Sequence, residues 1–158
     1  EWWERTYREQ SHLPLWRTMP LLEPLDMAVE EEAVDLFIPQ EGLCLYPGVM
    51  YLGCTEEYTE THGFVPRLDG RSSVGRLGMC IHLTAAFGDI GFRGHWTLEI
   101  TVVHPLVVYS GTRICQISYE EVTGHVEEYQ GKYQGTVGPV PSRFHKEVAS
   151  QRGKPDRA

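Results

Sequence analysis

The stretch HWTLEITVV, residues 95 to 103, alternates large apolar side chains with polar ones. Successive side chains of a β-strand point to opposite faces of its sheet. The alternation therefore puts Trp96, Leu98 and Ile100 on one face and Glu99, with its two flanking threonines, on the other. We predict a strand whose apolar face packs in the core. Its other face is open to solvent, which is the default position for Glu99.

Short apolar runs of the same kind recur on both sides of this strand. They are AVDLFI (33–38), GLCLYPGVMYLG (42–53), MCIHLTA (79–85), PLVVYSG (105–111) and RICQISYEEV (113–122). Glycine and proline separate them at intervals typical of an all-β sandwich or barrel. Between strands, YPG (46–48) predicts a tight turn and GDIGFRG (88–94) predicts a glycine-rich hairpin.

The chain has the size and composition of one mainly β domain. Its 158 residues and 41% hydrophobic content are enough for a single core. We expect an N-terminal extension at residues 1–30, which is helical where Trp3 and Tyr7 share a face. The main domain is expected at residues 31–143 and a C-terminal tail at residues 144–158.

Composition disfavours two classes of partner. No run of about 18 apolar residues is present, and the first ten residues, EWWERTYREQ, lack the apolar segment of a signal peptide. We therefore expect a cytoplasmic protein with no membrane partner. The formal net charge of −8 argues against a nucleic-acid partner, because affinity for a polyanion depends on Lys and Arg that neutralise phosphates.

Zinc and the common phosphate-binding loops are disfavoured by motif. The four cysteines are dispersed, so we expect reduced and mostly buried thiols. They are Cys44, Cys54, Cys80 and Cys115. The combined HxE…PCxxC signature of zinc-dependent nucleobase deaminases is absent, because the chain contains no PCxxC, and so are GxSxG, GxGxxG and GxxxxGK[ST]. Any deamination by this chain would have to proceed without zinc.

The segment GRSSVGRLG, residues 70 to 78, gathers hydrogen-bond donors in a glycine-bounded turn. Arg71 and Arg76 carry guanidinium forks, and the two serines between them add hydroxyls, so the segment suits phosphate oxygens. A structural salt bridge explains the arginines equally well, and Asp89 in the 88–94 hairpin can simply bond to its own backbone. Local chemistry leaves both interpretations open.

Three motifs together resemble the dCTP deaminase family, a branch of the dUTPase-like superfamily. They are GRSSVGRLG, IHLTAAFGDIGFRGHWTLEI (81–100) and KYQGTVGPVPSR (132–143). The resemblance implies a distorted jelly-roll or β-clip fold and a homotrimer with active sites at subunit interfaces. It also implies a deoxycytidine nucleotide substrate whose phosphates carry Mg²⁺, with no zinc and no metal ligand in the protein itself.

The resemblance also implies roles for individual residues. Catalysis falls on Glu99 as general acid and base, on Arg76 and Ser72, and on the backbone carbonyl of Ala85. Substrate binding falls on Arg71, Ser73, Asp89, Gln116 and Lys132. The dUTPase branch carries an apolar residue in place of Glu99, so the family implies deamination of dCTP to dUTP and ammonia.

Several alternatives stay open at the level of sequence. They are a dUTPase, a bifunctional enzyme that also cleaves the triphosphate, a deaminase that prefers dCMP, and a non-catalytic nucleotide-sensing trimer. Thr136 stands where many family members carry glutamine, and Gly124 or His125 where tyrosine is usual. These positions belong to the segment that closes over the phosphates, so they bear on the phosphate count more than on deamination.

Overall fold

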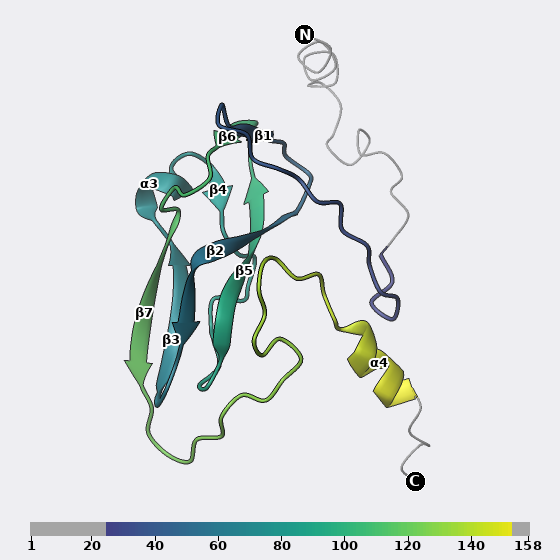
Figure 1. The fold of residues 1–158 in the computed structure, drawn as a ribbon, viewed down its shortest axis with the longest axis vertical. Coiled ribbons are helices and arrows are strands. Elements are labelled where there is room, and N and C mark those ends of the chain that lie inside the picture. The colour runs from purple at the N-terminus through teal and green to yellow at the C-terminus, as the bar shows by residue number, and fades with distance from the viewer. Residues whose placement is uncertain (1–24, 153–158) are drawn as a thin grey trace. The chain divides into compact units, whose positions relative to one another are not determined.

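The structure is a computed structural model that describes residues 25–152 (Figure 1). The helix predicted within residues 1–30 lies almost wholly outside the described residues, and residues 25–30 contain only a turn. Of the described residues, 25–31 and 144–152 belong to one unit, which includes helix α4 (His145–Arg152), a helix without buried residues. The other unit, Glu32–Arg143, carries all the predicted site residues.

The unit Glu32–Arg143 is built from short antiparallel strands in three small sheets. The strands are β1 (Leu43–Leu45), β2 (Tyr51–Glu60), β3 (Phe64–Gly70), β4 (Met79–Cys80), β5 (Arg93–Val102), β6 (Leu106–Val108) and β7 (Cys115–Glu121). In these sheets β1 pairs with β6, β5 pairs with both β2 and β4, and β3 pairs with β7. The predicted mainly β fold is confirmed.

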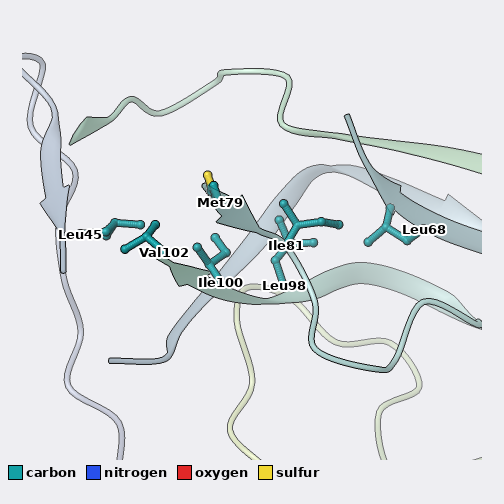
Figure 2. Close-up of a cluster of buried hydrophobic side chains, with 7 residues drawn as sticks. All are labelled: Leu45, Leu68, Met79, Ile81, Leu98, Ile100 and Val102. Carbon is teal, nitrogen blue, oxygen red and sulfur yellow. The ribbon is translucent and has the colours of Figure 1, made fainter. Parts of the chain in front are cut away.

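Strand β5 forms the centre of the core. Leu98, Ile100 and Val102 are 2%, 8% and 5% exposed, and Trp96 packs against them. Figure 2 shows these three side chains meeting four others from β1, β3, β4 and the residue after β4. Those four are Leu45, Leu68, Met79 and Ile81. The predicted alternation along residues 95–103 is confirmed, and it leaves Glu99 half-buried on the opposite face.

The strand predicted at residues 33–38 is wrong. This stretch has no regular structure, and Val34 and Phe37 are 86% and 84% exposed. Its pattern is that of a strand, but a strand needs a neighbouring backbone to satisfy its N–H and C=O groups. No strand of the described residues pairs with it.

The segment before the glycine-rich turn is also less regular than predicted. Of residues 79–85, only β4 is a strand, and residues 81–88 form a loop fastened to β3. The N–H of Leu68 donates to the carbonyl of Ala86 at 2.8 Å, and the N–H of Gly88 donates to the carbonyl of Pro66 at 2.8 Å. The turn at 88–94 is therefore fixed against β3 instead of closing a regular hairpin.

Two further predictions can be compared with the structure: the turn at 46–48 agrees with it, and the burial of the cysteines does not. Gly48 has φ of +81°, a conformation that favours glycine and that fits the predicted turn at 46–48.

Cys54 and Cys80 are exposed, so the expectation of mostly buried thiols is wrong for these two. Cys54 lies where the β2 register with β5 shifts, and such irregularities turn side chains away from the sheet.

Candidate functional site

A cavity of about 320 Å³ lies between β5, the glycine-rich turn and residues 129–142. Its polar lining includes Glu99 and Asp89. Its walls are largely aromatic and comprise Phe87, Phe92, Trp96, Tyr129 and Tyr133. Flat rings together with two carboxylates in one lining suit a planar, hydrogen-bonding ligand such as a nucleoside.

Glu99 is held in place inside this cavity. Its Oε2 accepts a hydrogen bond of 3.1 Å from the backbone N–H of Leu83, which lies in the loop after β4. A carboxylate with one oxygen fixed by a backbone donor keeps its second oxygen available for proton transfer. The solvent-facing interpretation of Glu99 is therefore incomplete, because the side chain is half-buried in a cavity.

The loop that bonds Glu99 also carries Ala85 and Asp89. Both residues are exposed, and Asp89 lines the cavity while Ala85 stands outside its lining. The carbonyl of Asp89 accepts a hydrogen bond of 3.2 Å from the N–H of Phe92 and so closes the turn. The main chain of Asp89 thus closes the turn, its carboxylate forms no hydrogen bond among the described residues, and its side chain lines the same cavity as Glu99.

The predicted phosphate-side residues meet in a second depression of about 660 Å³. It is lined by Arg71, Ser72, Ser73 and Gln116, among others. An Arg71 Nη donates to the carbonyl of Arg113 at 2.9 Å, and Gln116 Nε2 donates to the carbonyl of Gly70 at 3.3 Å. These bonds anchor the site to the paired ends of β3 and β7.

A single helical turn, α3 (Ser72–Gly75), presents the serines of this depression. The N–H of Arg76 donates to the carbonyl of Ser72 at 3.1 Å, and its side chain is exposed. Within residues 25–152, no ion pair joins Arg76 to Glu99, and Arg76 lines neither depression. One chain therefore holds the predicted site in two separate parts.

The rim near Tyr133 carries two cations. Lys132 Nζ lies 5.3 Å from the centre of the Tyr133 ring, and the Arg143 guanidinium lies 5.8 Å from it. The N–H of Arg143 donates to the Tyr133 hydroxyl at 2.9 Å, and its guanidinium donates to the carbonyl of Lys132. Sequence reasoning assigned a substrate-binding role to Lys132 and none to Arg143, although Arg143 is the last residue of the motif at 132–143.

Two absences apply to the part of the chain that the structure describes. Residues 25–152 contain no group of three or more His, Cys, Asp or Glu side chains that could hold a metal ion. Over the same range, no helix has both the length and the apolar character needed to cross a membrane.

Residues 16–122 match a family model described as dCTP deaminase-like. A curated protein of Leptospira biflexa, named dCTP deaminase, dUMP-forming, is 58% identical over 125 residues, which are 78% of this chain and 72% of the relative. Proteins of the same name from Cytophaga hutchinsonii and Clostridium botulinum are 55% and 53% identical. They cover 78% and 79% of this chain and 72% and 73% of their own lengths. The antiparallel β fold is consistent with this similarity.

Proposed function

The chain belongs to the dCTP deaminase-like family, and we propose that it deaminates dCTP and releases dUMP. The expected product dUTP is corrected, because the similar curated proteins are named dUMP-forming. Formation of dUMP from dCTP requires two hydrolyses. One exchanges the amino group at C4 for oxygen and releases ammonia, and the other cleaves the bond between the α- and β-phosphates and releases pyrophosphate.

The observation that carries this proposal is the fixed carboxylate of Glu99 in an aromatic cavity. A volume of about 320 Å³ is within the range typical of small-molecule sites, about 300–1,000 Å³. Glu99 is the one carboxylate that β5 places in the described lining, and the ring of His95, also on β5, is bonded through Nδ1 to the carbonyl of Thr55 at 2.9 Å. Asp89 in the same lining is suited to a deoxyribose hydroxyl.

For the deamination step, Glu99 accepts a proton from the attacking water as its oxygen bonds to C4. The carboxyl group delivers this proton to N3, then takes the proton of the new C4 hydroxyl and passes it to the amine. The C4–N bond breaks as the C4 carbonyl forms, so ammonia leaves and the base becomes uracil. A positioned acid and base of this kind supplies about 10² to 10⁴ in rate. The carbonyl of Ala85 and the hydroxyl of Ser72 orient the water in this scheme.

We infer that the two parts of the site meet across subunits of a homotrimer. In each chain the lining of the Glu99 cavity contains no residue of the 70–78 segment, and the depression at that segment contains no carboxylate. A partner subunit that presents its Ser72 and Arg76 to Glu99 completes the constellation. Arg76 then orients the carboxylate, as the resemblance implies.

The phosphates are held in this scheme by Arg71, Ser73 and Lys132, and Mg²⁺ enters as part of the substrate. Several contacts to the phosphate chain favour dCTP over dCMP. For the second hydrolysis a carboxylate must place the water that attacks the α-phosphate. Asp89 is better placed than Asp35 for this role, because Asp89 lines the cavity and Asp35 lies exposed in the irregular stretch before β1.

Product analysis tests this function. The protein is incubated with dCTP, dCMP, dUTP or CTP, each with Mg²⁺, and nucleotides, ammonia and pyrophosphate are measured. We expect dCTP to yield dUMP, ammonia and pyrophosphate in equal amounts, with slower reaction of dCMP and CTP. Pyrophosphate from dUTP without ammonia from dCTP would instead identify a dUTPase, and binding without any product would identify a nucleotide sensor.

A further inference from the structure

One wall of the catalytic cavity comes from the far end of the same chain. The wall segment (residues 126–143) runs from the end of β7 back along β5 (Figure 1). Its backbone pairs with the glycine-rich turn and the start of β5. The N–H of Tyr129 donates to the carbonyl of Ile90 at 2.7 Å, the N–H of Gly135 to that of Arg93 at 2.8 Å, and the N–H of His95 to that of Thr136 at 3.1 Å.

Two glycines of the turn make this close approach possible. A Cβ on Gly91 would lie 2.8 Å from the Cβ of Glu128, and a Cβ on Gly94 would lie 3.1 Å from the carbonyl oxygen of Thr136. Both glycines also have positive φ, +81° and +151°, which other residues rarely adopt. The turn is therefore shaped to receive the wall segment.

The side chain of Gln134 joins the wall segment to the turn at two points and forms a third hydrogen bond within the segment. Its Oε1 accepts a hydrogen bond of 2.8 Å from the N–H of Arg93. Its Nε2 donates to the carbonyl of Gly91 at 2.8 Å and to the carbonyl of Tyr129 at 3.1 Å. Only this orientation of the amide satisfies all three partners, because its oxygen accepts and its nitrogen donates.

We propose that Gln134 is a positioning residue for the nucleotide cavity. Gln134 does not line the cavity, whereas Tyr129 and Tyr133 on the same segment do. Its amide fixes the distance between those rings and the turn that carries Asp89, and so sets the width available to the nucleoside. The identity of that nucleoside rests on the proposed function, but the fastening of the wall does not.

If Gln134 has this role, its substitution should change KM much more than kcat. Glu99 and its Leu83 partner lie on β5 and the loop after β4, outside the wall segment. A loosened wall therefore weakens the binding of substrate and leaves the chemistry of the bound molecule nearly intact. The Michaelis constant for dCTP should rise while kcat stays almost unchanged.

Gln134→Glu tests this division because glutamate has the same size but lacks both N–H donors, and it places a carboxylate against two carbonyl oxygens. We expect KM for dCTP to rise about 10-fold or more, with kcat within about threefold of the parent. Gln134→Ala should act in the same direction. Gln130→Glu is the matched control, since Gln130 is exposed on the same segment and forms no hydrogen bond among the described residues. If Gln134→Glu matched the parent, the side chain would merely fill space and the proposal would be overturned.

Hydrogen exchange of the free protein separates this proposal from the proposed function. In Gln134→Glu and Gln134→Ala, the backbone amides of Tyr129 and Gly135 should exchange about 10-fold faster or more, while that of Leu98 in the core stays protected. Unchanged exchange at Tyr129 and Gly135 in both variants would overturn the proposal even if KM rose. A parent protein that does not act on dCTP would refute the function, and the exchange data would still decide the role of Gln134.

Discussion

The backbone N–H of Leu83 donates a hydrogen bond of 3.1 Å to the Oε2 of Glu99. This bond joins the loop after β4 to the central strand of the core. Because the loop also carries Ala85 and Asp89, the groups proposed to hold the water and the sugar are tied to the proposed proton carrier. A displacement of the loop would therefore disturb orientation and proton transfer together.

Glu99→Gln should abolish turnover while retaining the fold. The amide oxygen can still accept the hydrogen bond of Leu83, but a neutral amide cannot accept the proton of water. We expect kcat for ammonia release to fall by at least about 10², with dCTP binding measured by calorimetry nearly unchanged. Glu120→Gln on exposed β7 is the control and should resemble the parent. Near-parent deamination by Glu99→Gln would remove the mechanism.

Mixed oligomers should show that the site is shared between subunits. Ser72→Ala and Glu99→Gln proteins are each expected to be inactive in deamination. When the two are co-expressed in equal amounts, about one quarter of the sites in a closed ring pair an intact Ser72 with an intact Glu99. Activity should therefore return to about a quarter of the parent value, and light scattering should give a trimer mass. A fully active monomer, or no recovery on mixing, would contradict the shared site.

The sequence predicted the central strand better than it predicted the cavity. The alternation along residues 95–103 identified the buried face correctly, because a strand of period two meets the core on one side only. The same kind of pattern failed at residues 33–38, since periodicity says which side chains share a face and not whether a partner strand is present. Helix α3 was missed because a single turn with two serines and a glycine has little helical signal.

Two residues of the proposed site, Glu99 and Asp89, could be assigned from motifs, whereas the cavity that they line could not be predicted. Glu99 and Asp89 belong to one short stretch of sequence, so a resemblance could assign them. The aromatic wall opposite comes from residues 129–142, and the bond of Gln134 to Gly91 spans 43 positions. A local sequence pattern does not tell which distant segment packs against a turn. The glycines at 91 and 94 indicate only that another part of the backbone comes close to this turn.

The reaction should require Mg²⁺ because the phosphates of the substrate bind it, and should not require zinc. Mg²⁺ neutralises the phosphate chain, so treatment with EDTA should stop turnover of dCTP and added Mg²⁺ should restore it. Removal of zinc alone by a zinc-selective chelator should leave the rate unchanged. The measurement is ammonia release from dCTP under each condition, with the metal content checked by mass spectrometry. Loss of activity that only zinc restores would refute the prediction.

The cysteines should differ in reactivity. Burial, and then the negative charge of Glu57, raise the pKa of the Cys115 thiol, so less of it is thiolate near neutral pH. Iodoacetamide should therefore modify exposed Cys54 and Cys80 before Cys115, and the rate at Cys115 should increase as the pH rises toward its raised pKa. Peptide mass spectrometry measures the order, and protein unfolded in guanidinium, where all four thiols should react alike, is the control. Preferential labelling of Cys115 in the folded protein would contradict this assignment.

The position of the wall segment also determines when the cavity forms during synthesis. The seven strands found within residues 25–152 are complete by Glu121, so the growing chain can assemble its core before residues 126–143 have left the ribosome. The cavity closes only when this last part of the unit arrives and docks on a turn made some forty residues earlier. A chain that stops at residue 125 would therefore contain all the strand residues described here but lack the cavity wall that Tyr129 and Tyr133 form.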